Sequence, residues 1–332
     1  MEGDPNTQVV GVGAAVEFGR AVQEQVGRVV VGKADQTRLL IIALLADGHV
    51  LLDDVPGVAK TLVVRTLSAA LGLTFSRIQC TPDLLPGDVT GSLVFDQKLG
   101  VFEFRPGPLF ANVVLADEIN RATPRTQSAF LEAMEERGVT VDGVTHALKR
   151  PFVMLATQNP VELKGTFPLP EAQVDRFLLS LRMGYPSADD EALMLERFRA
   201  ADPLAAVQPV VSPEDVLAVR EVVRSVHVSG DVARYVVALT RATRESELVR
   251  LGASPRASLA LQRAAQAVAA LDGRDYVVPD DVQGVAAPVL AHRLLLARDA
   301  VVEGRTAEAV VGEVVGAVPV PAAGQGDRPA GS

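Results

Sequence analysis

The chain has little of what several protein classes require. It contains one cysteine, Cys80, so no disulfide can form within it, and Cys80 is expected to be a small core residue at a strand end. Its four histidines are scattered, without the spacing of a metal site. The longest apolar run, residues 39–46, is far too short to cross a membrane. Residues 1–5 have neither the basic nor the apolar region of a signal peptide. We therefore expect a cytoplasmic protein with no membrane span.

An excess of positive charge is also missing. The formal net charge is −9 at pH 7, which disfavours a surface made for non-specific nucleic-acid binding but leaves room for a local basic pore. Apolar residues, by contrast, are abundant. Of its 332 residues 48% are hydrophobic, enough to bury a full core in two domains or one large one.

The chain is organised around residues 49–61. Residues 50–52 form a short apolar run that predicts a buried strand, and a Pro-Gly turn follows it. Lys60 and Thr61 then open a helical pattern. A strand, a glycine-bearing turn, Lys-Thr and a helix are the order of a phosphate-binding loop, in which backbone N–H groups face the anion. Lys60 would reach the β- and γ-phosphates, and the Thr61 hydroxyl would ligate Mg²⁺.

Two residues depart from the G-x-x-x-x-G-K-[ST] pattern of such a loop. Asp54 and Ala59 occupy its two glycine positions, so Gly57 is the one glycine that remains. Alanine tolerates a positive φ less well than glycine, at a cost of about 1 kcal/mol if the loop requires that conformation. Asp54 adds a negative charge near a polyphosphate. By itself the stretch also fits an ordinary strand–turn–helix whose lysine is solvated.

A pair of carboxylates follows another apolar run. Residues 113–116 are apolar and lead directly into Asp117 and Glu118. A parallel sheet presents acids in this way at its carboxyl edge, beside a phosphate loop. Asp117 would hold Mg²⁺, directly or through water, and Glu118 would orient and deprotonate the attacking water. Solvated acids at a strand end are common, but the partnership with the upstream Lys-Thr favours the catalytic interpretation.

Three further polar residues stand at suggestive places. Asn159 ends an apolar strand, where its amide could fix the attacking water, although Asn-Pro alone is a turn former. Arg176 lies between a short helix and an apolar strand and in isolation would be a surface arginine. Arg256 lies just inside a helix start, where the helix dipole disfavours a cation, so it invites an anionic partner such as a phosphate.

Apolar runs and turn signals divide the rest of the chain. They predict an α/β core over residues 14–185 and a smaller all-helical domain over 186–303, with a flexible segment before the core and a low-complexity tail at 304–332. The expected strands are residues 50–52, 73–80, 112–116, 152–156 and 177–183, and the expected hairpins are 91–104 and 138–145. The expected helices are 14–26, 36–46, 124–136, 170–175, 188–200, 213–226, 230–246, 255–271 and 279–296, besides the helix that Lys60 opens.

Several stretches together resemble the MoxR family of AAA+ ATPases, over about residues 15–300. The matching stretches are 55–61, 81–88, 117–122, 130–136, 156–160, 169–177 and 252–257. The resemblance implies a five-stranded parallel-sheet P-loop core with an all-α lid. It implies that Asn159 is the sensor-1 residue, Arg176 the arginine finger acting on a neighbouring subunit, and Arg256 the sensor-2 residue that reports the γ-phosphate from the lid.

The resemblance also implies the ligands and the assembly. ATP would lie between the subunits of a hexameric ring, with Mg²⁺ on Thr61 and Asp117. The residues expected around the nucleotide are Val30, Val31, Gly32, Pro56, Gly57, Val58, Ala59, Lys60, Thr61, Leu62 and Asp117. Residues 87–106 would be the helix-2 insert and 138–150 the hairpin before sensor 1, both facing the pore or a partner.

The family resemblance implies a chaperone that remodels or activates protein clients, among them proteins with von Willebrand factor A domains. Three alternatives remain: the ATPase subunit of a metal chelatase, a nucleic-acid motor, and a nucleotide-gated switch with negligible hydrolysis. The insert has only Lys98 and Arg105 against Asp96 and Glu103, which fits protein contact better than nucleic acid. Glu118, Asn159 and Arg176 argue against the switch.

Overall fold

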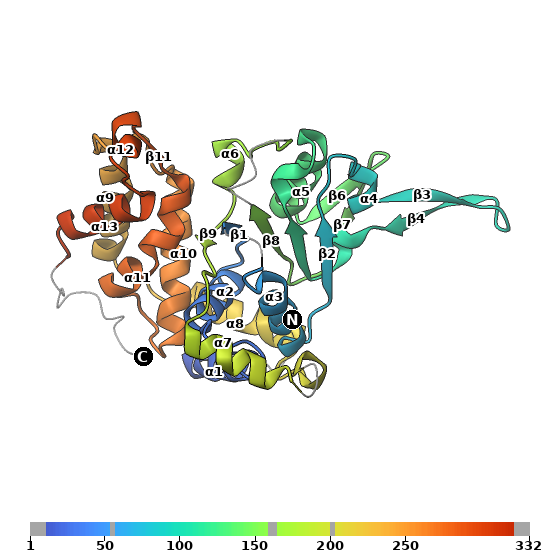
Figure 1. Ribbon diagram of the computed structural model, residues 1–332, viewed down its shortest axis with the longest axis horizontal. Helices are drawn as coiled ribbons and strands as arrows, with labels where there is room; N and C mark the ends of the chain where they lie inside the picture. The colour runs from blue at the N-terminus through green and yellow to red at the C-terminus, as the bar shows by residue number, and fades with distance from the viewer. Residues whose placement is uncertain (1–10, 54–56, 159–164, 200–202, 322–332) are drawn as a thin grey trace, which may run out of the picture.

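Figure 1 shows the computed structural model, which describes residues 11–53, 57–158, 165–199 and 203–321. A sheet lies at the centre, a helical domain flanks it on one side, and a long hairpin projects on the other. The strands of the sheet are β1 (Val50–Asp53), β2 (Phe75–Gln79), β5 (Val113–Asp117), β8 (Val153–Gln158) and β9 (Leu179–Leu181). The predicted five-stranded α/β core with an all-helical lid is therefore confirmed.

The strand order places the functional loops at one edge. The order is β2-β5-β8-β1-β9, and every neighbouring pair is parallel. The carboxyl ends of β1, β2, β5 and β8 therefore meet at the same edge of the sheet. The register pairs Gln79 with Asp117 and Asp53 with Gln158 at that edge.

The strands are apolar because both faces of the sheet are covered. Val113 and Leu115 of β5 belong to the core formed with α1, α2 and α3, whereas Val114 and Ala116 belong to the core formed with α5. This alternation follows the two-residue period of a strand. The covering helices are α1 (Val12–Gly27), α2 (Ala34–Leu45), α3 (Lys60–Ala70) and α5 (Pro124–Glu136).

Two hairpins extend from the core, and both were predicted. The first joins β3 (Gly91–Asp96) to β4 (Val101–Pro106), and the second joins β6 (Gly138–Val141) to β7 (Val144–Ala147). Helix α4 (Pro86–Thr90) leads into the first hairpin, which projects far from the sheet in Figure 1. Phe104 of β4 stacks on His146 of β7, with ring centroids 3.8 Å apart, so the two hairpins are in contact.

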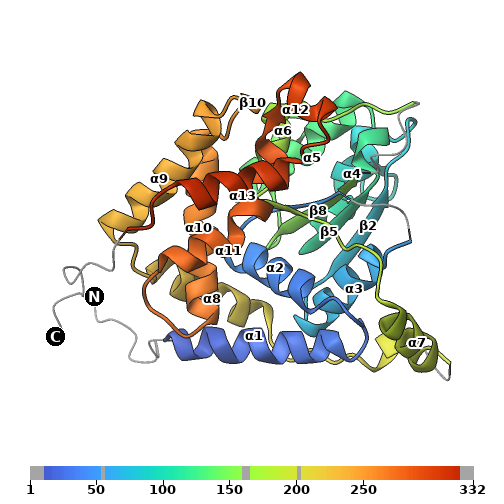
Figure 2. The same cartoon turned by 60° about the vertical axis from the view of Figure 1, so that its left-hand side comes forward.

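The second half of the described chain is mainly helical. In Figure 2, α1 runs below α2, α8 and α11, and α13 crosses α10 and α11. The apolar core is continuous from α1 and α2 into this region, because α10 packs on both helices. The elements are α6 (Glu171–Val174), α7 (Ala188–Arg197), α8 (Pro213–Ser225), α9 (Gly230–Glu245), β10 (Val249–Leu251), α10 (Pro255–Leu271), α11 (Pro279–Leu290), β11 (Leu295–Leu296), α12 (Arg298–Val302) and α13 (Ala307–Ala317). Within the described ranges, no helix is both long and apolar enough to cross a membrane.

The predicted helix over residues 279–296 is too long. Helix α11 ends at Leu290, a 3₁₀ turn follows at Ala291–Arg293, and β11 then pairs with β10. Pro288 removes one backbone N–H within the last turns of α11, where the helix stops. The apolar pattern continued past this point because the segment stays packed against the core.

The predicted low-complexity tail also needs correction, because part of it is helix α13. Thr306 caps this helix by accepting the Ala309 backbone N–H. Val310, Val311 and Val314 are buried and lie on one face, which packs on α9 and α11. The Ala-, Val- and Gly-rich composition concealed an ordinary amphipathic helix. Residues 322–332 lie outside the described part of the chain.

Candidate active site

The phosphate loop leads from β1 into α3, as the sequence predicts. Lys60 is the first residue of α3, and Ala59 precedes it with φ +61°, in the left-handed region. Ala59 therefore adopts the left-handed conformation that is less favourable for alanine than for glycine. Gly57 has φ +86°. The loop, Thr61 and the ends of β2, β5 and β8 surround a cavity of about 400 Å³.

Asp117 is held at both of its carboxylate oxygens. Thr157 Oγ1 donates to Oδ1 over 2.7 Å, and Arg77 Nη2 donates to Oδ2 over 2.6 Å. The Thr157 hydroxyl also accepts the backbone N–H of Glu118 over 2.7 Å. One threonine of β8 thus fixes the position of both acids at the end of β5.

Glu118 is held by two donors from other parts of the site. Its Oε2 accepts from Gln79 Nε2 over 3.0 Å and from Arg121 Nη1 over 3.1 Å. The Gln79 oxygen accepts from Arg77 Nη2 over 2.9 Å, so its nitrogen is the atom that faces the carboxylate. A chain of hydrogen bonds therefore runs from Asp117 through Arg77 and Gln79 to Glu118.

The oxygen donors of this cavity fit Mg²⁺. Thr61 and Asp117 line it together and offer a hydroxyl and a carboxylate, which are ligands that Mg²⁺ takes in proteins. The Arg77 guanidinium shows that a positive charge is accommodated beside Asp117. Among the described residues, no group of three or more His, Cys, Asp or Glu could hold a metal ion. A cation here would therefore take further oxygens from water and phosphate.

Cys80 lies directly after β2 and is fully buried, which confirms the sequence prediction for this residue. Burial, together with the negative charges of Asp117 and Glu118, raises the pKa of its thiol to about 12. The thiol is therefore neutral near pH 7 and has no nucleophilic role in the site.

A second cavity of about 220 Å³ adjoins the first and shares Gly57, Ala59 and Leu62 with it. Its other lining residues are largely apolar, which suits one face of a purine base. They are Val29, Val30, Val31, Lys33, Val58, Tyr185, Pro186, Glu191, Met194 and Phe198.

Gly32, expected near the base, is not among the residues that line this second cavity. Its φ is +67°, and a Cβ there would lie 2.3 Å from Asp190 Oδ2. The positive φ favours glycine at this position, and the Asp190 carboxylate at the start of α7 lies against it.

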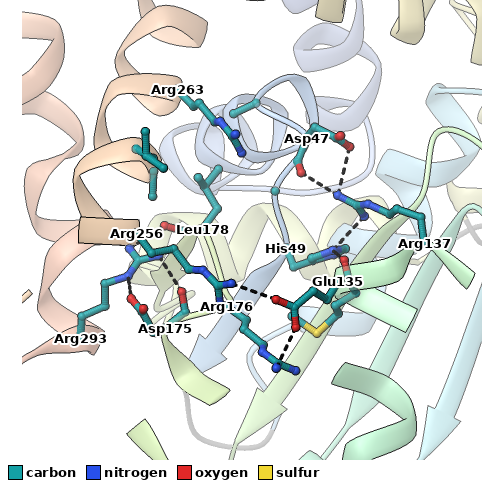
Figure 3. Close-up of a pocket in the computed structure, with 15 residues that line it drawn as sticks. Asp47, His49, Glu135, Arg137, Asp175, Arg176, Leu178, Arg256, Arg263 and Arg293 are labelled. Carbon is teal, nitrogen blue, oxygen red and sulfur yellow. Dashed lines mark hydrogen bonds and ion pairs between the residues drawn. The ribbon is translucent and has the colours of Figure 1, made fainter. Parts of the chain in front are cut away.

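Arg176 and Arg256 lie in a third cavity of about 340 Å³, shown in Figure 3. Both point at Glu135 near the end of α5: Arg176 Nη2 is 2.7 Å from Oε2, and Arg256 Nη2 is 2.9 Å from Oε1. Arg137, Arg263 and Arg293 line the same cavity, and because its acids are only Asp47, Glu135 and Asp175, the lining has a net positive charge.

The two sets of predicted residues lie at opposite ends of β1. Residues 57–62, which follow β1, line the phosphate-loop cavity, and residues 46–49, which precede it, line the arginine cavity. The structure thus brings Lys60, Thr61, Asp117 and Glu118 together but places Arg176 and Arg256 elsewhere. Pro56 and Asn159 lie outside the described residues.

Sequence reasoning missed the residues that hold these groups in place. On the phosphate side they are Arg77, Gln79, Arg121 and Thr157, and on the arginine side Glu135, Asp175 and Arg293. One signal was available: polar side chains two residues apart on a strand share a face, as Arg77 and Gln79 do. The long-range partners left no local pattern.

The parallel sheet, the phosphate loop, the paired acids and the helical lid define an AAA+ ATPase. Residues 49–179 match the family described as "ATPase family associated with various cellular activities (AAA)". Residues 241–314 match the AAA lid domain. A crystal structure from Cytophaga hutchinsonii, described as that of an ATPase, superposes with a TM-score of 0.87 and 39% identity, covering 93% of this chain and 98% of that one.

Relatives over most of the chain narrow the class to one family. Chaperone MoxR1 of Mycobacterium tuberculosis is 44% identical over 91% of this chain and 82% of its own. The uncharacterized protein YeaC of Bacillus subtilis is 53% identical over 92% and 95%. Protein MoxR of Paracoccus denitrificans is 33% identical over 92% and 96%. The chain belongs to the MoxR family of AAA+ ATPases.

Proposed function

We propose that the chain is a MoxR-type remodelling ATPase that hydrolyses ATP with Mg²⁺ at sites shared between the subunits of a hexameric ring. One observation carries the proposal: the phosphate loop and the arginine pair lie at opposite ends of β1. A four-residue strand spans roughly 13 Å, so the arginines of a subunit face away from its own nucleotide. This separation supports a role of the arginines in the site of a neighbour.

The split site implies a particular kind of interface. If one end of each subunit completes the other end of the next, the contact is head-to-tail, and such contacts form a ring when the rotation between subunits closes. Six subunits is the number that the family resemblance implies. Glu135 would give up Arg176 and Arg256 when the γ-phosphate of the neighbour's ATP arrives, because that phosphate carries more negative charge than one carboxylate.

The residues of the phosphate side have assigned roles in this proposal. Backbone N–H groups of the loop and Lys60 bind the phosphates, and Glu118 accepts a proton from the attacking water. Thr61 and Asp117 would hold Mg²⁺, which neutralises charge on the β- and γ-phosphates. Asn159 would orient the water. Arg176 stabilises the charge that develops in the transition state, an effect of 10³–10⁵ in rate in other nucleotide hydrolases.

We propose protein clients, among them proteins with von Willebrand factor A domains. Chaperone MoxR1 carries the word chaperone in its name, which supports a protein client. The tip of the projecting hairpin exposes Leu99, Val101 and Phe102, whose exposed fractions are 72%, 51% and 67%. An exposed apolar tip suits contact with another protein better than contact with a phosphate backbone.

The first experiment measures mass and turnover together. Light scattering gives the mass of the purified protein with and without ATP and Mg²⁺, while phosphate release is followed at several protein concentrations. We expect a shift to about six subunits and a specific activity that rises with concentration, because each site needs two subunits. Turnover by a species that remains monomeric would refute the shared site.

A further inference from the structure

Arg293 is a buried arginine that holds the turn carrying Arg176. Its side chain is 2% exposed, and it lies in the 3₁₀ turn after α11 of the lid. Each of its five N–H groups has a partner. The partners are Asp175 Oδ1 and the backbone oxygens of Asp175, Phe177, Leu178 and Val289.

Three of these backbone oxygens flank the predicted finger. Arg293 Nη2 donates to Phe177 O over 2.6 Å and to Asp175 O over 3.2 Å, on either side of Arg176. Arg293 Nη1 donates to Leu178 O over 3.1 Å. Burial lowers the pKa of Arg293 to about 10, while Asp175 opposes that shift, so the guanidinium stays charged near pH 7. One lid residue therefore fixes the backbone on both sides of the finger.

Asp175 joins the same turn to the start of α10. Its Oδ2 accepts from Ser254 Oγ over 2.8 Å, and Ser254 caps α10 two residues before Arg256. Its Oδ1 accepts from Arg293 Nε over 2.8 Å. The segments that carry the two arginines sharing Glu135 are thus also joined by the carboxylate of Asp175, whose side chain is 20% exposed.

We propose that Arg293 is a positioning residue for Arg176: with Asp175 it clamps the lid to the finger turn, so that Arg176 is held in a fixed position when it reaches the neighbouring nucleotide. Movement of the lid then moves the finger. The inference rests on the proposed role of Arg176 in a neighbour's site.

A double-mutant cycle on the full chain tests the clamp. Arg293→Lys keeps the charge but cannot span carbonyls on both sides of Arg176. We expect turnover to fall about 10²-fold, the cost of a misplaced catalytic group, with the KM for ATP changed less than about twofold. Arg176→Ala should cost about 10³-fold or more, and adding Arg293→Lys to it should cost nothing further. Losses that multiply in the double variant would overturn the clamp.

Arg220→Lys is the matched control. Arg220 is also buried, with 5% of its side chain exposed, but its hydrogen bonds go to Asp47 Oδ1, over 2.6 Å, and to Leu44 O rather than to the finger turn. Its replacement should lower stability without lowering turnover of the folded protein. An equal loss of turnover in Arg220→Lys and Arg293→Lys would mean that Arg293 only stabilises the fold, and would overturn its role in positioning Arg176. If Arg176→Ala has full activity, the proposed finger role fails as well.

Mixed assemblies locate the defect. Glu118→Gln subunits supply arginines but no catalytic base, and Arg176→Ala subunits supply the reverse, so mixing them should restore turnover. Arg293→Lys added to the Glu118→Gln subunit should abolish the restoration, whereas the same change in the Arg176→Ala subunit should leave it intact. If Arg293→Lys only damaged the fold, it would lower the restored turnover equally in either subunit. An equal loss in the two mixtures would therefore overturn the clamp. No restoration in the reference mixture refutes supply by a neighbour, while the double-mutant cycle still decides the clamp.

Discussion

At the scale of single residues, hydrogen bonds hold both acids of the phosphate site in place. Asp117 pairs with Arg77, and Glu118 accepts from Gln79 and Arg121. Glu118 itself adopts a left-handed backbone conformation, with φ +56°, which is uncommon outside glycine. Such strain persists where surrounding contacts over-determine the geometry, and it fits a residue whose carboxylate must be aimed.

Lys60 and Glu118 should separate binding from chemistry. We expect Lys60→Ala to abolish nucleotide binding, because it removes the cation at the phosphates. Glu118→Gln should bind ATP normally but turn over at least 10²-fold more slowly, because it cannot accept a proton. Titration with a fluorescent ATP analogue and phosphate release measure the two effects. Normal turnover in Glu118→Gln would remove Glu118 from the role of base.

Arg77 competes with a metal ion for Asp117 and should weaken its binding. The pair is half exposed, so its contribution is small, at most about 1 kcal/mol. Arg77→Ala should therefore raise the apparent Mg²⁺ affinity of the nucleotide-bound protein about two- to fivefold, measured by calorimetry. Arg121→Ala is the control, because Arg121 carries the same charge but pairs with Glu118. It should change the apparent Mg²⁺ affinity less than Arg77→Ala does. A weaker Mg²⁺ affinity in Arg77→Ala would contradict this account.

At the scale of elements, the packing of α13 decides whether the end of the lid is structured. Val311 is 1% exposed and packs within the lid core, whereas Val302 at the end of α12 is 80% exposed. Val311→Ala should lower the free energy of unfolding by about 2 kcal/mol, because it removes buried methyl groups and leaves a cavity. The identical change at Val302 should alter it by less than about 0.5 kcal/mol. Urea unfolding of both variants makes the comparison.

The root of the long hairpin shows a second constraint at this scale. Gly91 has φ +91°, and a Cβ there would lie 2.2 Å from Arg105 O. At its root, β3 thus approaches β4 so closely that only glycine fits. This close approach and the stack of Phe104 on His146 hold the hairpin in its projecting direction.

At the scale of the whole molecule, buried His49 makes stability depend on pH. The residue is 4% exposed, and its Nδ1 accepts the Met154 N–H over 2.9 Å. Burial, and to a smaller extent the positive charge of Arg137, lowers the pKa of His49 well below 6.5. Below pH 6.5, His49 therefore binds a proton in the unfolded chain but stays neutral in the folded chain. The contribution of His49 to stability is therefore fully present above pH 6.5 and is lost as pH falls below it, by about 1.4 kcal/mol per pH unit. Urea unfolding at pH 7.0, 6.0 and 5.0 measures this slope.

A His49→Gln variant is the control for that slope. It should be less stable at pH 7, but its stability should fall less between pH 6.5 and 5. A slope equal to that of the unmodified chain would assign the effect to other groups.

Much of the molecule followed from local patterns. The sheet strands were predicted because buried parallel strands are continuous apolar runs, and α5 and α10 because a cap and a proline mark their starts. Asp117 and Glu118 were found because they end such a run, and Lys60 and Thr61 because they follow a strand and a Pro-Gly turn and open a helix. The helix α13 was missed because glycines and alanines surround its two valine pairs and give the segment the composition of a linker, so only the lid surface that covers it reveals the buried face.

The sequence by itself determined the class of the protein: a strand followed by a phosphate loop, a second strand followed by two acids, and a helical lid. Such information is carried by neighbours along the chain, whose spacing matches strand and helix periods. Only the tertiary structure decided which residues meet. It placed Arg176 and Arg256 on Glu135 at the far end of β1, and Arg293 on Asp175, because these contacts join segments whose separation in sequence carries no periodic signal.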